Sequence, residues 1–237
     1  MNGVVLNGSA SSVTDFSAWM AAQGARVEQA LSDWVPASTP AGLGEAMRYA
    51  VLDGGKRLRP MLVLAAAEAV QGHAVAALRA ACAAELIHAY SLVHDDMPCM
   101  DNDVLRRGKP TVHVQFGEAT ALLAGDALQA LAFELLTPEG DAVPPAMQAD
   151  LCRLLACAAG AHGMAGGQAI DLASVGKPLA EPELRAMHRL KTGALLQGSV
   201  RMGAACASDV PTAARKALDN YGAAIGLAFQ VVDDILD

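Results

Sequence analysis

Aromatic residues are scarce in this chain: 4% of its 237 residues are Phe, Trp or Tyr, whereas alanine alone fills 50 positions. Alanine adds little to the packed face of a β-sheet but is the strongest helix former. The composition therefore disfavours a sheet protein and predicts an all-α fold. Since 237 residues is near the upper limit for one hydrophobic core, we expect one large domain.

Other absences exclude classes of function. The net charge of −8 argues against sequence-independent nucleic-acid binding. The five cysteines include no C-x-x-C pair, which disfavours a zinc site or a disulfide framework and indicates reduced thiols in a cytoplasmic protein. The N-terminus has no basic segment followed by an apolar core, so we expect no secretion signal. The longest uncharged run, 154–170, has 17 residues and four glycines, so we expect no membrane span.

Helical periodicity, interrupted by proline and glycine, organises the rest of the chain. We expect a disordered N-terminus over residues 1–11 and one helical domain over 12–237, without a linker or repeat. Residues 98–117 contain two prolines and two glycines and are expected to form a long loop. The expected helices cover about 15–34, 41–53, 60–71, 74–96, 118–136, 145–173, 181–206 and 211–237.

The segment DDMPCMD places three carboxylates, Asp95, Asp96 and Asp101, directly after an apolar helix. Adjacent aspartates at a helix C-terminus face the negative end of the helix dipole, which is unfavourable unless a cation is bound there. Carboxylate oxygens are ligands that suit Mg²⁺. For this cluster alone, a solvated turn is an equally good explanation.

A second acidic cluster, DDILD, places Asp233, Asp234 and Asp237 at the end of another apolar helix. Like charges four residues apart destabilise a helix. Two such clusters, each closing a buried helix, are difficult to explain as surface decoration. Together they predict the facing walls of a site for metal and diphosphate.

Basic residues accompany these motifs. GGKRLRP supplies Lys56, Arg57 and Arg59 at a loop-to-helix junction, and LRRGKP supplies Arg106 and Arg107. Arginine binds phosphate oxygens in a bidentate manner, so these two sets predict two diphosphate sites. Either set alone would more often be a solvated cationic patch.

With LLAGDAL, GMAGGQAIDL and HRLKTGALL between them, these motifs resemble the trans-type short-chain polyprenyl diphosphate synthases, most closely the bacterial farnesyl diphosphate synthases, over residues 54–237. The resemblance implies an isoprenoid-synthase-type helical bundle around a central cavity, a homodimer and three Mg²⁺ ions per active site. It implies Mg²⁺-dependent condensation of isopentenyl diphosphate with dimethylallyl or geranyl diphosphate to farnesyl diphosphate. A synthase for geranylgeranyl or another short prenyl diphosphate is the alternative.

The resemblance also assigns site residues. Isopentenyl diphosphate is assigned to Lys56, Arg59, His88 and Arg107, and the allylic diphosphate to Arg106, Lys191, Thr192 and Gln230. Mg²⁺ is assigned to Asp95, Asp101 and Asp233, with Asp96, Asp234 and Asp237 completing the clusters and Gln168 and Asp171 lining the site. The residues expected to carry the chemistry are Asp95, Lys191, Thr192, Gln230 and Asp233.

Tyr90 lies five residues before Asp95 and therefore about 7.5 Å deeper along the helix. In the resembling family this position forms the floor of the pocket for the growing hydrocarbon, so we expect Tyr90 to stop elongation at fifteen carbons. The neighbouring Ser91 offers no second block, and the alternative is a Tyr90 that merely packs in the core. Asp126 lies in an apolar helix and is expected either to be paired or to lie near the site.

Three alternatives remain. A terpene cyclase of class I shares the first aspartate motif but usually carries a different second motif and has no need of GGKRLRP. A ferritin-type metal bundle is suggested by Glu85-x-x-His88 but requires a second Glu-x-x-His, and the chain has no other. A non-catalytic partner subunit is disfavoured by the intact charged motifs. Since members of the family continue beyond the second motif, we expect the native protein to be longer, with C-terminal helices that this sequence lacks.

Overall fold

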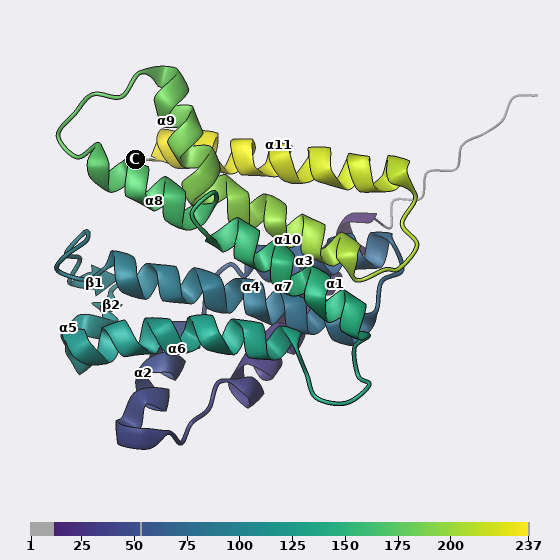
Figure 1. The fold of residues 1–237 in the computed structure, drawn as a ribbon, viewed down its shortest axis with the longest axis horizontal. Coiled ribbons are helices and arrows are strands. Elements are labelled where there is room, and N and C mark those ends of the chain that lie inside the picture. Colours follow the sequence, from purple (N-terminus) through teal and green to yellow (C-terminus); the bar gives the residue numbers. More distant parts are fainter. Residues whose placement is uncertain (1–11, 53, 237) are drawn as a thin grey trace, which may run out of the picture.

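The computed structural model describes residues 12–52 and 54–236, and the side chains of residues 16–52 and 54–229. The expected tail over residues 1–11 lies outside the described residues. Helices dominate the described part, which confirms the all-α prediction (Figure 1). The longer helices are α1 (Ser12–Trp34), α2 (Leu43–Val51), α3 (Leu58–Ala69), α4 (Ala74–Asp95), α6 (Glu118–Leu136), α7 (Pro145–Ala159), α8 (Met164–Ala173), α9 (Glu181–His188), α10 (Ala194–Ala205) and α11 (Thr212–Leu236).

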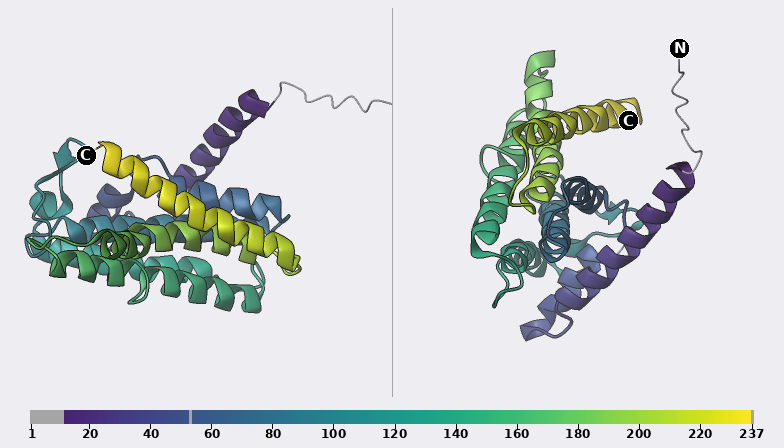
Figure 2. Two further views of the ribbon diagram at one scale, coloured as in Figure 1. Left: turned by 90° about the horizontal axis from the view of Figure 1, so that it is seen from above. Right: turned by 90° about the vertical axis from the view of Figure 1, so that its right-hand side faces the viewer.

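The central helix of the fold is α4, which packs against α1, α2, α3, α6, α7 and α10. The end-on view in Figure 2 shows the other helices arranged around α3 and α4. Residues 80–87 of α4 are all buried, as expected for a helix that is apolar on every side. Most of them are alanine or larger aliphatic residues; the charged exception is Glu85.

Two of the expected helices are interrupted. The segment 145–173 forms two helices, because the chain turns between Gly160, which has extended dihedrals, and Gly163, whose dihedrals are also non-helical. The segment 181–206 contains a π-helical turn, η2 (Arg189–Gly193), between α9 and α10. Such turns are rare and occur frequently at functional sites. Periodicity alone did not reveal either interruption.

The expected long loop also has local structure. It contains a hairpin of β1 (Leu105–Arg106) and β2 (Lys109–Pro110), followed by the short helix α5 (Val112–Phe116). The hairpin turn consists of Arg107 and Gly108, which both have positive φ, at 53° and 79°. That combination matches the twist of a two-residue hairpin, and glycine adopts it readily.

Two helices, α4 and α6, are long and apolar enough to cross a membrane by length and composition alone. In α4 the apolar window is 61% buried inside the protein, as in a core helix. The corresponding window of α6 is 39% buried, and Leu122 and Leu123 lie exposed on it. The expectation that no segment spans a bilayer stays a prediction.

Candidate active site

A cavity of about 370 Å³ lies beside the C-terminal half of α4. Helix α8 and the turn η2 form the opposite side, and α3 contributes Arg59. The predicted site residues that line it are Arg59, His88, Tyr90, Ser91, Asp95, Gln168, Lys191 and Thr192. The structure thus brings together eight residues that the sequence predicted from four separate motifs.

Unpartnered polar atoms mark this cavity as a binding site. Nε of Arg59 and both amide atoms of Gln168 are buried without a hydrogen-bond partner in the described part of the chain. A buried polar group without a partner costs about 1–3 kcal/mol. A ligand carrying several oxygen atoms would satisfy these groups.

The electrostatics of the cavity favour an anion. Burial lowers the pKa of Arg59 to about 10, against the opposing effect of Glu85, so the guanidinium remains charged at neutral pH. Burial, together with the nearby cations Arg59 and Arg107, lowers the pKa of His88 well below its usual value of 6.5. His88 is therefore neutral at pH 7 and presents one hydrogen-bond donor and one acceptor.

Lys191 is held in the wall by an ion pair with Asp171 of α8, with 2.5 Å between Nζ and Oδ2. The pair requires α8 and η2 to approach closely, and Gly167 permits this. A Cβ added at Gly167 would lie within 2.7 Å of backbone atoms of Leu190 and Lys191. Gly167 of GMAGGQAIDL therefore serves the placement of Lys191.

The structure separates Arg57 from its basic neighbours. Its guanidinium is buried and donates to Glu28 at 2.6 Å, to Glu85 at 2.8 Å and to the carbonyl oxygen of Val51 at 2.7 Å. The residue has φ of 46° and precedes α3 directly. Arg57 thus fixes the junction between the loop that carries Lys56 and the first turn of α3, which carries Arg59.

Glu85 is buried in α4, where the sequence suggested a metal site shared with His88. Its carboxylate pairs with Arg57 and supports the charge of Arg59. This pairing removes the basis for a ferritin-type metal site at Glu85 and His88. The available signal was a single acidic residue inside an otherwise apolar helix, which requires a buried cationic partner.

The hairpin brings a further cation to the same loop. Nη1 of Arg107 donates to the carbonyl oxygen of Gly54 at 3.1 Å, and a Cβ at Gly55 would lie 2.9 Å from that nitrogen. The glycines of GGKRLRP therefore accommodate Arg107 next to exposed Lys56. Lys56 and Arg107, which the resemblance assigns to the same diphosphate, therefore come from two motifs that lie side by side.

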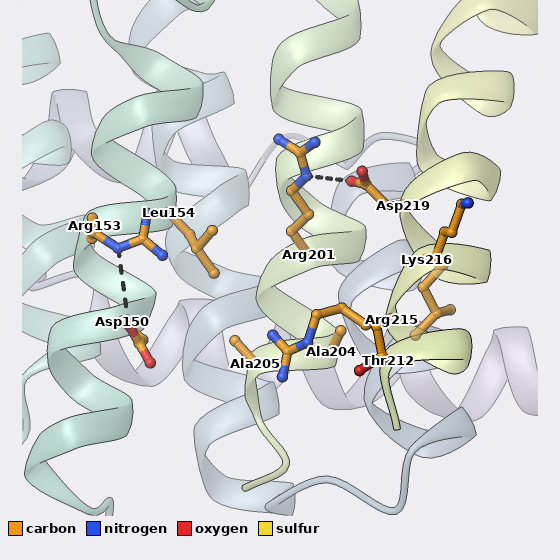
Figure 3. Close-up of a pocket in the computed structure, with 11 residues that line it drawn as sticks. Asp150, Arg153, Leu154, Arg201, Ala204, Ala205, Thr212, Arg215, Lys216 and Asp219 are labelled. Carbon is orange, nitrogen blue, oxygen red and sulfur yellow. Dashed lines mark hydrogen bonds and ion pairs between the residues drawn. The ribbon is translucent and has the colours of Figure 1, made fainter. Parts of the chain in front are cut away.

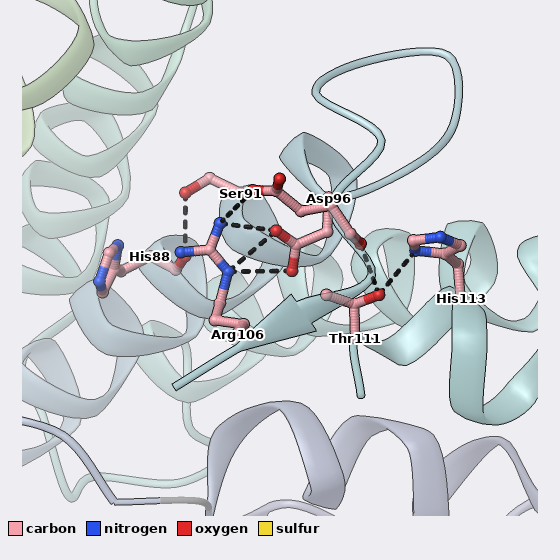
Figure 4. A network of polar contacts seen from close by, with 7 residues as sticks. His88, Ser91, Asp96, Arg106, Thr111 and His113 are labelled. Atoms are coloured by element: carbon pink, nitrogen blue, oxygen red, sulfur yellow. Dashed lines mark hydrogen bonds and ion pairs between the residues drawn. The ribbon is translucent and has the colours of Figure 1, made fainter. Parts of the chain in front are cut away.

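Two predicted site residues are paired with each other. Arg106 donates to both carboxylate oxygens of buried Asp96, at 2.6–2.9 Å (Figure 4). Thr111 lies beside them and donates to the backbone of Asp103. In this arrangement Asp96 anchors the hairpin to the end of α4, and its predicted role in metal binding stays a prediction.

Asp95 lies at the rim of the cavity, and Asp101 lies in the segment that follows α4. Burial raises the pKa of Asp95 to about 6; Lys191 opposes this effect and Asp101 adds to it. The N–H of Asp101 donates to the carbonyl oxygen of Asp95 at 2.9 Å, which keeps the two residues close. A divalent cation would stabilise two carboxylates in this position, so the donor set fits Mg²⁺. Among the described residues, no three acidic, histidine or cysteine side chains lie close enough together to hold a metal ion, so these two carboxylates would supply only part of a complete ligand set.

The second acidic motif lies at the end of α11. The side chains of Gln230, Asp233, Asp234 and Asp237 lie outside the described residues, so their assignments stay predictions.

The expectation for Asp126, that it is paired or lies near the site, was wrong. Asp126 is exposed on α6 and does not line the cavity, so the burial that would require a partner is absent.

A second cavity of about 380 Å³ lies between α7, α10 and the start of α11 (Figure 3). Its charged side chains are solvated, and two of its arginines are paired, Arg201 with Asp219 and Arg153 with Asp150. No buried unpartnered polar atom of the described residues lines it. The first cavity is therefore the better candidate for the active site.

Comparison with known proteins agrees with this geometry. Residues 40–237 match the polyprenyl synthetase family model. The chain is 52% identical over 224 residues to a probable farnesyl diphosphate synthase of Bradyrhizobium diazoefficiens, covering 92% of this chain and 67% of the relative. It is 49% identical to the farnesyl diphosphate synthase of Geobacillus stearothermophilus, covering 89% and 71%.

A solved structure of an FPP/GFPP synthase from Zymomonas mobilis superposes with a TM-score of 0.88 at 45% identity, covering 94% of this chain and 82% of that one. The isoprenoid-synthase architecture expected from the sequence is therefore confirmed. With its aspartate-rimmed cavity, its basic loops and these relatives, the chain belongs to the polyprenyl synthetase family.

Proposed function

We propose that this prenyltransferase joins isopentenyl diphosphate head to tail with dimethylallyl and then geranyl diphosphate, giving farnesyl diphosphate. The observation that carries the proposal is the cavity in which Arg59 and Gln168 lack partners, with Asp95 at its rim and Tyr90 in its lining. Its polar groups suit diphosphate oxygens, and its apolar lining suits a hydrocarbon tail.

The residues divide between two diphosphates. Arg59, His88, Arg107 and Lys56 lie on the side of the GGKRLRP loop, where we assign isopentenyl diphosphate. Lys191 and Thr192 lie across the cavity, where we assign the allylic diphosphate together with Arg106 and Gln230. Gln168 and Asp171 support that side, the latter through its ion pair with Lys191.

The reaction breaks the allylic C–O bond, leaving an allylic cation and diphosphate. The double bond of isopentenyl diphosphate attacks the cation and forms the new C–C bond, and a proton is then lost to the departing diphosphate. Lys191 stabilises the negative charge that develops on the leaving group, and the apolar side chains that line the cavity shield the cation from water. Mg²⁺, for which three ions per site are expected, would neutralise the diphosphate when held by Asp95, Asp101 and Asp233, with Asp96, Asp234 and Asp237 completing the clusters.

Incubation with Mg²⁺, geranyl diphosphate and labelled isopentenyl diphosphate tests the reaction. We expect a labelled fifteen-carbon product, and none in the presence of EDTA. Absence of any prenyl product from the folded protein would overturn the proposal.

Product length needs its own test, because one relative is named an FPP/GFPP synthase and another, from Arabidopsis thaliana, a geranylgeranyl pyrophosphate synthase. Tyr90 is 9% exposed and lines the cavity, as a pocket floor would. We expect Tyr90→Ala to yield products of twenty carbons or more, whereas the control Tyr221→Ala, at an exposed tyrosine, keeps fifteen. An unchanged product from an active Tyr90→Ala variant would assign Tyr90 to the core alone.

The assembly that we propose is a homodimer formed through α6. Leu122 and Leu123 are 47% and 55% exposed on this helix, and Val114 of α5 is 50% exposed. Exposed apolar patches often mark protein contacts. Light scattering should show a dimer for the native sequence and a monomer for Leu123→Asp, while Val75→Asp on α4 remains dimeric. A monomeric native protein would contradict this assignment.

We also propose a cytoplasmic location. All five cysteines are free thiols, and burial raises the pKa of Cys82 and Cys206 to about 12, which leaves both unreactive. Fractionation of the producing cells, with the protein detected by antibody, tests the location.

A further inference from the structure

Helix α6 packs against the part of α4 that carries Tyr90 and lines the cavity. Helices α4 and α6 pack side by side along their length (Figure 1). Burial raises the pKa of Tyr90, and Gln129 on α6 lies close enough to the Tyr90 hydroxyl to oppose that effect. The position of the tyrosine ring therefore depends on residues that do not themselves touch the cavity.

His94 is the second ring in this lining. It lies one helical turn beyond Tyr90, and the two rings meet edge to face, with 5.7 Å between centroids and 75° between planes. Nε2 of His94 lies 3.1 Å from the carbonyl oxygen of Leu122 on α6. Both rings line the cavity, so together they separate it from α6.

Gly125 provides the space for the His94 ring. A Cβ added at this buried glycine would lie within 2.8 Å of three ring atoms of His94. Real side chains do not approach so closely, so a side chain at position 125 must displace the ring. Helix α6 stands behind the ring and Tyr90 beside it, so displacement moves the ring toward the cavity.

We propose that Gly125 is a specificity-determining residue for product length, acting through the position of His94. This inference rests on the proposed function, because it assumes that the hydrocarbon tail occupies the cavity. With glycine at position 125, the His94 ring lies against α6 and leaves room for the tail beside Tyr90. A larger residue at 125 takes that room, and a smaller residue at 94 adds to it.

Two substitutions should therefore shift the product in opposite directions. Gly125→Ala pushes the ring inward, and we expect the fraction of ten-carbon product to rise at least fivefold. His94→Ala opens the space over Gly125, and we expect a twenty-carbon product that the native protein does not make in the same assay. His94→Phe keeps a ring in place without the polar contact and should retain the fifteen-carbon product.

The double variant Gly125→Ala/His94→Ala covers the possibility that Gly125→Ala does not fold. If the clash is with the His94 ring, removing the ring should restore the melting temperature and bring the product back toward fifteen carbons. A double variant as unstable as Gly125→Ala would overturn the proposal, as would identical product distributions in all active variants. If the native protein makes no prenyl product, the proposed function fails, and the melting temperatures still test the contact.

Discussion

Glu85 accepts a hydrogen bond from Arg57 at 2.8 Å, and less than a tenth of either side chain is exposed. Breaking a buried pair leaves an uncompensated charge, which is far more costly than losing a surface pair. Arg57 also lies between Lys56 and Arg59, directly before α3 begins.

Glu85→Gln should therefore weaken the binding of isopentenyl diphosphate selectively. We expect its KM to rise about tenfold, equivalent to about 1.4 kcal/mol, with little change in the KM for geranyl diphosphate. The same chemical change at Glu181, whose pair with Arg185 is exposed, should alter neither constant. Equal increases in both KM values for Glu85→Gln would contradict a role in positioning the loop.

The neutral state of His88 predicts a pH dependence of stability. Its pKa in the folded protein is well below 6.5, mainly because of burial, whereas the unfolded chain binds a proton near pH 6.5. Below that pH the unfolded state binds more protons, so the stability contributed above pH 6.5 is lost as the pH falls.

Urea unfolding of the native protein and of His88→Gln between pH 5 and 8 measures this contribution. The difference in unfolding free energy should change below about pH 6.5 and stay constant above it. A difference that does not vary with pH would show that His88 keeps its ordinary pKa. Asp95 is present in both proteins, so its own titration largely cancels.

Asp95→Asn should abolish most turnover without unfolding the protein. The half-buried carboxylate lies near Asp101, so removing one charge relieves repulsion when no cation is bound. We expect turnover to fall by two or more orders of magnitude and the melting temperature without metal to stay the same or rise. Asp150→Asn, at an exposed position on α7, is the control. A large drop in melting temperature would assign Asp95 a structural role instead.

Gly167→Ala tests the contact between α8 and η2. The added Cβ meets backbone atoms, which yield less than a side chain does, so we expect a loss of about 1–3 kcal/mol in stability. The KM for geranyl diphosphate should rise as well, because Lys191 moves away from Asp171. Gly24→Ala in α1, where no atom lies within 4 Å of the new Cβ, should be neutral or slightly stabilising. An unchanged KM in the Gly167 variant would separate this packing from substrate binding.

The sequence predicted the fold class and most helices, because alanine content and apolar periodicity are local properties. It also predicted that residues from distant motifs share one cavity, which the position of Lys191 opposite Asp95 exemplifies. The charge pattern of GGKRLRP did not by itself distinguish Arg57 from Lys56 and Arg59; only the family resemblance left Arg57 out of the site. The distinction depends on Glu28 and Glu85, which come close only after α1 and α4 have packed. The break between α7 and α8 and the turn η2 were missed because apolar periodicity does not mark either of them.

The turn η2 makes the length of this segment as important as its composition. A π-helical turn accommodates one more residue than an α-helical turn, so it is the structural equivalent of a single-residue insertion. Deleting one residue between 189 and 193 would allow α9 and α10 to join as one regular helix. The helices on either side would keep nearly their present orientations, because five residues of π-helix and four of α-helix both complete roughly one turn, but the side chains within the turn would point in new directions. Substitutions leave the number of residues in the turn unchanged. Single-residue deletions and insertions are therefore the changes that would redirect the side chains of Lys191 and Thr192.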